Sequence, residues 1–151
     1  MLSVVPRHGQ GGRPTVVPLL GLGLQRGAIA HTVAHDCHNL LVAGRSAADM
    51  AVAVAALHRT GGGFVLVEDG AVVAEVPLPL AGLMSFEPCE VVAGQIDRFN
   101  QAALERGIKP MASTPIVAMT GIALAVIPEV RITDKHPLFD VESQKPLPLF
   151  V

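Results

Sequence analysis

Tryptophan and tyrosine are absent from this 151-residue sequence, and phenylalanine occurs only five times. A hydrophobic core made from this chain must therefore be aliphatic. Hydrophobic residues nevertheless make up 50% of the chain, charged residues only 16%, and the mean hydropathy is +0.49. This composition suggests a surface that is buried against another domain or subunit, although scattered exposed aliphatic side chains would also explain it.

Strong charge, paired cysteines and long hydrophobic runs are missing as well. The net charge is −2 and there is no basic run, which argues against nucleic acid as a partner. Cys37 and Cys89 form no CxxC motif, so a reduced protein of the cytoplasm is expected rather than a disulfide framework. The apolar stretch 116–127 is shorter than the ~20 residues that a membrane span needs, and the N-terminus lacks the apolar core of a signal peptide.

A first helix is predicted over residues 46–60. Ser46 and Asp49 have the spacing of a capping box, in which each side chain bonds to the backbone amide of the other residue. Gly61 stands where helices commonly end in a left-handed residue. The apolar stripe of this helix is predicted to consist of Met50, Val54 and Leu57.

A second helix is predicted from Glu87 or Pro88 to Glu105, with its end at Gly107. Proline suits the first helical turn because no intrahelical bond uses its missing amide proton there. The predicted apolar stripe consists of Val92, Ile96, Phe99 and Ala103.

Several short strands are also predicted. Two β-branched runs flank Asp69-Gly70, a dipeptide typical of two-residue hairpin turns. Residues 28–35 alternate so that Ile29, Val33 and His35 share one face, which predicts a strand. Further short strands are predicted at NLLVAG, VRIT and LFDV.

The remaining stretches are less regular. Residues 1–27 are rich in glycine and proline, which predicts an irregular lead-in. Pro77 and Pro79 lack amide donors, which predicts a loop over PLPLAGLMS. The pattern of residues 116–125 fits a buried strand or a helix equally. Together the elements predict one α+β domain over residues 1–151, a mixed β-sheet with a β-hairpin and about two main helices.

Candidate functional residues concentrate in HTVAHDCHN, residues 31–39. On a strand, His31 and His35 would share a face but stand ~13 Å apart, too far to bind one ion. On a helix they would converge, but the alternating pattern around them argues against a helix. Asp36 and His38 would lie ~6.6 Å apart on one face, where they could share a metal or pair for proton transfer.

Two interpretations of this segment stay open. Asp36 and Asn39 could build a turn through hydrogen bonds to their own backbone, with His35 a buried and satisfied histidine. Alternatively, the polar residues open a loop that holds a functional site, where the Asn39 amide can donate and accept hydrogen bonds. A complete metal site is disfavoured because no second ligand cluster accompanies this one.

Two nucleotide-related motifs fail on inspection. The triplet at 61–63 lies between a helix and a strand, whereas phosphate loops run from strand through glycines to helix, so a helix cap and a turn are predicted. The small zinc deaminases need His-x-Glu followed by Pro-Cys-x-x-Cys. Here no second cysteine follows Cys89 at that spacing and no His-x-Glu occurs.

Three further polar residues allow two interpretations each. Cys37 lies between two histidines and could be a nucleophile, but a small space-filling residue is favoured. His8 is either a polar contact within a glycine-rich loop or a residue without a role. Glu87 favours the start of the second helix by its charge, with contact to a substrate as the alternative.

Three long segments resemble a known family. They read GAIAHTVAHDCHNLLVAG, DMAVAVAALHRTGGGFVLVEDGAVVAEVPLPLAGLMS and LAVIPEVRITD. These segments resemble the C-terminal domain of bacterial adenine deaminases, enzymes of the amidohydrolase superfamily, and the similarity covers residues 7–151. The order VAHD-x-HN, GGG and PLPLAGLMS is more specific than any one of these motifs.

The resemblance implies that the chain is part of a larger enzyme. The family hydrolyses adenine to hypoxanthine and ammonia with a metal-activated water, and its iron or manganese lies in a preceding TIM barrel of ~250 residues. The resemblance therefore implies no metal site in this chain. His31 stands where the family carries a small hydroxyl residue, so it is not expected to bind metal. The implied site residues are His35, Asp36 and His38 in support of catalysis, and Asn39, Ser85 and Glu87 in contact with substrate.

Three hypotheses about function follow. The favoured one is a C-terminal domain that supports or lines the active site of an amidohydrolase barrel, in the same or a separate chain, and is inactive alone. The second is a stand-alone purine-binding module or an oligomeric assembly module without catalysis. The weakest is an independent metallohydrolase that uses Asp36 and His38. The expected partners are the barrel and adenine, with neither nucleic acid nor a membrane.

Overall fold

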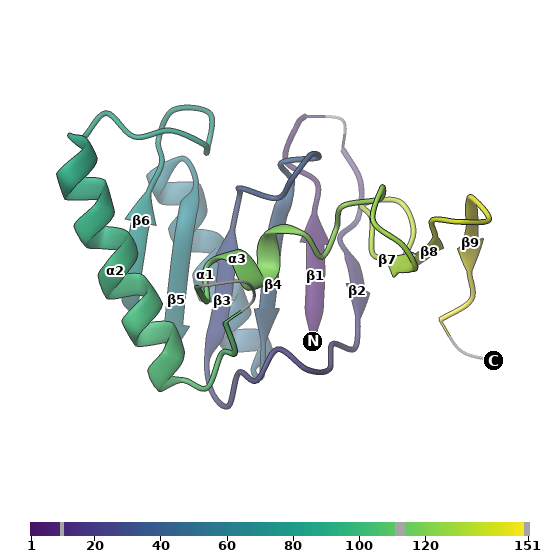
Figure 1. The fold of residues 1–151 in the computed structure, drawn as a ribbon, viewed down its shortest axis with the longest axis horizontal. Coiled ribbons are helices and arrows are strands. Elements are labelled where there is room, and N and C mark those ends of the chain that lie inside the picture. The colour runs from purple at the N-terminus through teal and green to yellow at the C-terminus, as the bar shows by residue number, and fades with distance from the viewer. Residues whose placement is uncertain (10, 111–113, 150–151) are drawn as a thin grey trace.

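An antiparallel sheet forms the centre of the molecule (Figure 1). The computed structural model describes residues 1–9, 11–110 and 114–149, and in these the sheet has six strands in the order β2-β1-β4-β3-β5-β6. The strands are β1 (Leu2–Val5), β2 (Thr15–Val17), β3 (Ala28–His31), β4 (Leu40–Gly44), β5 (Gly63–Glu68) and β6 (Ala71–Pro77). The α+β class is confirmed, but each strand pair within the described residues is antiparallel, where a mixed sheet was expected.

Helices cover both faces of this sheet (Figure 1). α1 (Ala47–Thr60) packs on β3, β4 and β5, while α2 (Cys89–Glu105) and the short α3 (Val117–Thr120) lie on the other face. Because neighbouring residues of a strand point to opposite faces, β3 serves both layers: Ile29 joins the core under α2, and Ala30 joins the core under α1. Among the helices of the described ranges, none is both long and apolar enough to cross a membrane.

The first helix begins and ends where the sequence predicted. The Ser46 side chain accepts a hydrogen bond from the Asp49 amide, and Gly61 ends the helix with φ of 80°. The predicted stripe is only partly right, because Leu57 is buried but Met50 and Val54 are half-buried. The helix lies on the sheet through small residues, since its buried positions are Asp49, Ala53, Ala56 and Leu57.

The Asp49 carboxylate does not complete a capping box. It accepts a hydrogen bond from the Gly70 amide at 2.8 Å, so it joins the helix to the hairpin turn between β5 and β6. That turn is the predicted one, because Asp69 and Gly70 have φ of 51° and 76°, the pair of positive values that a type I′ turn requires.

The second helix is confirmed over Cys89–Glu105, with Pro88 as its N-cap. Phe99 and Ala103 are buried, as predicted. The other two members of the predicted stripe, Val92 and Ile96, are half-buried and pack against the same core.

The prediction of an irregular lead-in over residues 1–27 is wrong, because this segment contains β1 and β2. β1 pairs with β4 on one side and β2 on the other. Both strands are only three or four residues long, too short for alternation to stand out beside the glycines and prolines around them. Those residues form the connections, where glycine and proline are tolerated.

The predicted strand over residues 28–35 is too long. β3 ends at His31. The Thr32 amide still donates to the Gly63 carbonyl oxygen at 3.0 Å, while the Thr32 hydroxyl donates to the Gly82 carbonyl oxygen at 2.6 Å and accepts from the Gly63 amide at 2.8 Å, and the chain beyond Thr32 turns away from β5. Val33 and His35 therefore do not continue the strand. The predicted extended segment at NLLVAG is confirmed as β4.

The chain after α2 is mostly irregular. Residues 116–125, predicted as either strand or helix, contain the one-turn α3 followed by turns. The strands predicted at VRIT and LFDV are confirmed as β7 (Val130–Arg131) and β8 (Leu138–Asp140). β9 (Lys145–Leu147) completes a small antiparallel sheet and was not predicted. Its central residue is Pro146, which argues against a strand in the sequence but is tolerated here because β9 lies at the edge of the sheet.

The glycine triplet is a structural connection between helix and strand, as predicted. At Gly63, φ is 126° and an added Cβ would lie 2.0 Å from the Val76 carbonyl oxygen. No side chain fits there without moving backbone of β6.

Replacing Gly63 with alanine is therefore expected to lower the free energy of unfolding by more than about 3 kcal/mol. Gly94→Ala is the matched control: Gly94 lies inside α2, φ is not positive, and the nearest atom to its new Cβ would be Arg98 Nη1 at 3.5 Å. That change is expected to be neutral or to stabilise by up to about 1 kcal/mol. Urea unfolding followed by circular dichroism measures both, and equal losses would contradict the prediction.

Candidate functional site

The segment HTVAHDCHN crosses from the core to a surface turn. After β3, residues 35–37 form a turn that the His38 amide closes by donating to the Ala34 carbonyl oxygen at 2.6 Å. His38 has φ of 47°, in the left-handed region that few residues other than glycine adopt. The His35 amide donates to the Thr120 carbonyl oxygen at 3.2 Å, which ties the turn to α3.

Arg7 holds the turn from the other side. Its Nε donates to the His38 carbonyl oxygen, and its Nη2 donates to the Ala81 carbonyl oxygen at 2.7 Å. The Arg7 amide also donates to Asn39 Oδ1 at 3.4 Å. Partial burial lowers the pKa of Arg7, yet a guanidinium stays charged in proteins. Arg7 thus clamps the 35–39 turn to the loop between β6 and α2.

Arg7 was not among the predicted site residues. It is five residues from the start of β1 in sequence and 31 residues from His38. Its only signal in the sequence was a charged residue beside His8, at the edge of a glycine-rich stretch. The β1–β4 pairing brings it to the turn.

The structure pairs the predicted side chains differently from the sequence argument. The carboxylate of Asp36 lies 2.9 Å from His35 Nε2, and both side chains are about two-thirds exposed, at 68% and 67%. His38 does not pair with Asp36; its ring centroid is 6.4 Å from that of His35. The interpretation of His35 as a buried histidine is therefore wrong, and the strand geometry assumed for Asp36 and His38 is replaced by a turn.

A polar hollow of about 410 Å³ lies beside this turn. His8 Nε2 is 2.8 Å from the Cys37 carbonyl oxygen, so His8 makes a polar contact with the turn. The hollow also brings in two charged residues that sequence reasoning missed, Asp134 and Lys135. They lie about a hundred residues from Cys37 in sequence, and no local motif connects them to it.

Ser85 and Glu87 lie on the loop between β6 and α2. Ser85 Oγ accepts from the Glu87 amide at 3.0 Å, and Glu87 is exposed just before the N-cap of α2, where a negative charge is favourable. The loop is joined to the 35–39 turn through Arg7, which donates to the Ala81 carbonyl oxygen, and its Gly82 carbonyl oxygen accepts from the Thr32 hydroxyl. Within the described residues, no hydrogen bond or ion pair joins Ser85 or Glu87 to the turn.

In residues 1–9, 11–110 and 114–149, no three histidine, cysteine, aspartate or glutamate side chains are grouped closely enough to hold an ion. His35 and Asp36 form a pair, whereas catalytic metals in proteins normally use three protein ligands.

His31 lies apart from the turn, inside the core. Its ring stacks on Phe64 with centroids 5.4 Å apart, and the residue is fully buried. Burial lowers the pKa of His31 to about 4, partly offset by the nearby backbone of Val33 and Met119. Within the described residues, neither ring nitrogen has a partner in hydrogen-bond geometry. His31 is therefore a neutral core residue.

Known proteins similar to this chain share one description. The model of the adenine deaminase C-terminal domain family matches residues 1–145. The chain is 47% identical over 142 residues to an adenine deaminase of Brucella anthropi, covering 94% of this chain and 25% of that protein. For the adenine deaminases of Brucella melitensis and Shigella sonnei the identities are 45% and 44%, with 24% of each protein covered. The chain thus spans about a quarter of the length of these relatives.

The buried His31 predicts a pH-dependent stability. Its folded pKa of about 4 lies below the ordinary 6.5, so the unfolded chain binds a proton that the folded chain excludes. Stability is complete above pH 6.5 and falls by about 3 kcal/mol as the pH decreases to 4. His31→Leu should remove this component, while the exposed His58→Gln should keep it. Urea unfolding at pH 7.5, 6, 5 and 4.5 checks the prediction, and parallel profiles for wild type and His31→Leu would contradict it.

The clamp predicts that Arg7 controls the rigidity of the turn. Arg7→Lys keeps the charge but loses the planar fork that reaches two carbonyl groups. Exchange of the His38 amide is expected to accelerate about tenfold, equivalent to losing about 1.4 kcal/mol of local stability. Arg26→Lys is the control: the mostly exposed Arg26 pairs with the largely buried Glu68, away from the turn, and the change should leave the His38 rate unaltered. NMR hydrogen exchange measures both, and an unaltered His38 rate in Arg7→Lys would refute the clamp.

Proposed function

Because the chain belongs to the family of adenine deaminase C-terminal domains, we propose that it supports or lines the active site of an amidohydrolase barrel. The reaction of the whole protein is the hydrolysis of adenine to hypoxanthine and ammonia. The chain itself supplies the 35–39 turn and the loops around it. The barrel belongs to the same or a separate chain.

One observation carries this proposal: residues 35–38 are fixed through their backbone while the side chains of His35 and Asp36 stay mostly exposed. Three backbone groups of residues 35–38 bond to Thr120, Ala34 and Arg7. The side chains of His35 and Asp36 are nevertheless mostly exposed. A turn with only a structural role would more commonly use its polar side chains to hold itself together. In this turn the Asn39 side chain has such a role, since it accepts from the Arg7 amide, whereas His35 and Asp36 pair with each other and are left available to a partner.

The His35–Asp36 pair has a suitable chemistry for a supporting role. A carboxylate that accepts from one imidazole nitrogen orients the ring and stabilises its charged form, leaving the other nitrogen to hold or transfer a proton. The His38 ring lies beside this pair, with its centroid 6.4 Å from that of His35. We assign these three residues to the support of catalysis, with the side chains of Asn39, Ser85 and Glu87 as candidates for substrate contacts.

The metal of the proposed reaction does not fit the donor set of this chain. The described residues bring together a histidine–aspartate pair rather than a group of three ligands. We therefore expect iron or manganese to be held by the barrel, and we assign no step of the reaction to a metal bound here. An independent metallohydrolase has no supporting observation among the described residues.

A second candidate is a purine-binding module without catalysis, alone or in an oligomer. The polar hollow between His8, Cys37, Asn39 and Lys135 supports it, because it could admit a small polar ligand without a barrel. For either function we place the protein in the cytoplasm, since Cys37 and Cys89 are both free thiols.

A chimaeric enzyme tests the first proposal. In it, this chain replaces the matched quarter of the Brucella anthropi adenine deaminase, and kcat for adenine is measured. His35→Ala and Asp36→Asn are each expected to lower kcat at least tenfold, because proton transfer by a positioned group contributes about 10²–10⁴-fold. The exposed His58→Ala on α1 and Glu75→Gln on β6 are the matched controls and should stay within twofold.

Two results would count against the proposal. If the His35, Asp36 and His38 variants all retain full activity in an active chimaera, the turn does not serve the active site. If the isolated chain with bound metal deaminates adenine, the assignment of the chemistry to a barrel is wrong. Titration of the isolated chain with adenine and hypoxanthine then tests the second candidate function. Binding of either purine without turnover would support a purine-binding module.

A further inference from the structure

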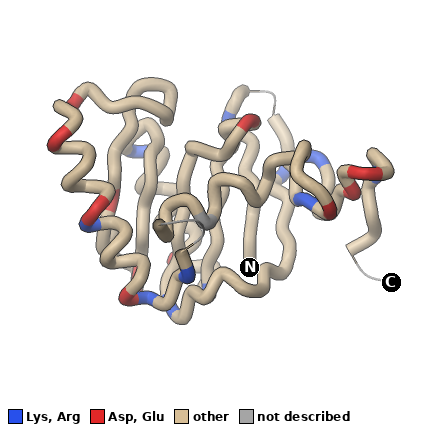
Figure 2. Tube along the Cα trace, in the orientation of Figure 1, with Lys and Arg blue, Asp and Glu red and all other residues tan. Residues whose placement is uncertain are grey.

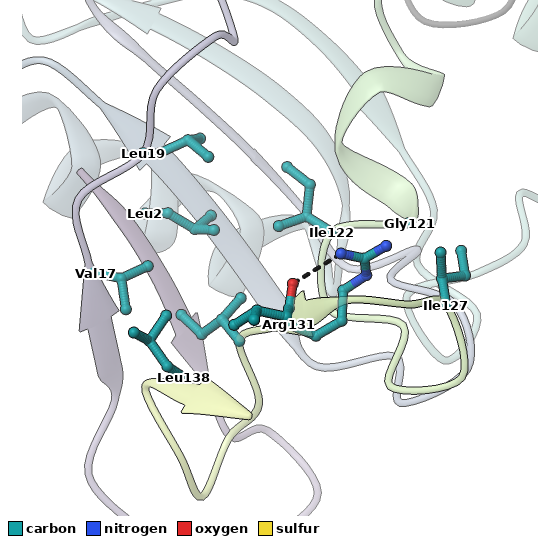
Figure 3. Close-up of a pocket in the computed structure, with 10 residues that line it drawn as sticks. Leu2, Val17, Leu19, Gly121, Ile122, Ile127, Arg131 and Leu138 are labelled. Atoms are coloured by element: carbon teal, nitrogen blue, oxygen red, sulfur yellow. Dashed lines mark hydrogen bonds between the residues drawn. The ribbon is translucent and has the colours of Figure 1, made fainter. Parts of the chain in front are cut away.

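An apolar groove opens on the face of the sheet that α3 covers, beside β1 and β2 (Figure 3). It has a volume of about 410 Å³, and Figure 3 shows Leu2, Val17, Leu19, Ile122 and Leu138 around it. We call it the Leu19 groove. Leu19 also lines two adjoining hollows of about 400 and 220 Å³, together with Leu20, and Ile122 lines the larger of them.

The surface around the Leu19 groove carries no charge over two long stretches. Residues 14–25 and 114–128 contain no lysine, arginine, aspartate or glutamate, and Figure 2 shows the charged residues gathered instead on α2, at the ends of the sheet and near β7–β9. Large side chains here are open to solvent: Leu20 is 92% exposed and Val126 is 71% exposed. Exposed apolar side chains gathered around apolar hollows are typical of an interaction site.

Arg131 does not make the groove polar. Its guanidinium is turned back on its own segment, where it donates to the carbonyl oxygens of Val130 and Pro128 (Figure 3). Its aliphatic stem therefore faces the groove. The matching surface of a partner should be aliphatic, with no need for an acidic residue.

We propose that the Leu19 groove receives aliphatic side chains of the catalytic region that precedes this domain in adenine deaminases. This inference rests on the proposed function. In the relatives, the matched part is a C-terminal domain and three quarters of the protein lie outside it. The family model matches from residue 1, and Met1 lines the smallest of the three hollows while its neighbour Leu2 lines the groove.

The position of the groove agrees with the position of the turn. Leu2 begins β1 at the groove, and Arg7, beyond the other end of β1, clamps the 35–39 turn. At about 3.3 Å per residue the two lie about 17 Å apart. A catalytic region docked in the groove can therefore also reach the turn.

Cysteine labelling in the same chimaera tests the docking. Leu20→Cys is placed in the isolated chain and in the chimaera, and maleimide labelling is followed by mass spectrometry of the peptide that contains it. The labelling rate is expected to fall at least tenfold in the chimaera. Val73→Cys, on the exposed edge strand β6, is the control. Its labelling rates in the isolated chain and in the chimaera should agree within twofold.

A charge substitution provides the second measurement. Leu20→Glu should leave the melting temperature of the isolated chain unchanged, because Leu20 is exposed there. In the chimaera it should lower the melting temperature by several degrees, whereas Val73→Glu should not. An equal effect of Leu20→Glu in both proteins would overturn the docking.

The outcomes separate this inference from the proposed function. Unprotected Leu20→Cys in a chimaera that deaminates adenine overturns the docking and leaves the function standing. Protected Leu20→Cys in an inactive chimaera supports the docking and counts against the function. If Leu20→Cys is already protected in the isolated chain and that chain sediments as a dimer, a second copy occupies the groove and the inference is wrong.

Discussion

The pairing of β1 with β4 is the constraint on which the rest of the structure depends. β1 pairs with β4 residue by residue from Leu2 to Val5, and β2 adds to its other side. This ladder brings Arg7 to the 35–39 turn and places Leu2 in the Leu19 groove. A slip by one residue would turn Leu2 and Val4 to the opposite face and displace both. The first seven residues therefore position both surfaces that we assign to the catalytic region.

The turn shows how a fold can present polar side chains without using them for its own stability. Backbone donors and acceptors must be satisfied, and here Arg7 and the Thr120 carbonyl satisfy those of the turn. His35 and Asp36 are consequently left with only each other. His31, four residues earlier, has the opposite environment: it stacks on Phe64 in the core, where burial keeps it neutral. One short segment thus contains a structural histidine and exposed ones.

The sequence predicted best where structure is decided within a few residues. Ser46 and Gly61 marked the ends of α1, and Asp69-Gly70 marked the hairpin, because capping and tight turns depend on adjacent groups. It failed for β1 and β2, whose stability comes from neighbours distant in the chain. The sequence pattern also predicted Met50 and Val54 as members of the buried stripe of α1. The helix instead buries Ala53 and Ala56, because small side chains allow it to approach the sheet closely.

For the candidate site, the sequence by itself determined which residues are chemically suited to it, and the family to which the chain belongs, because both are properties of ordered residue types. Tertiary structure alone decided how they are used. It separated His31 from His35, paired Asp36 with His35 instead of His38, and brought Arg7, Asp134 and Lys135 to the turn. The physical reason is that strand pairing and loop contacts join residues far apart in the chain, and their geometry is absent from any local pattern.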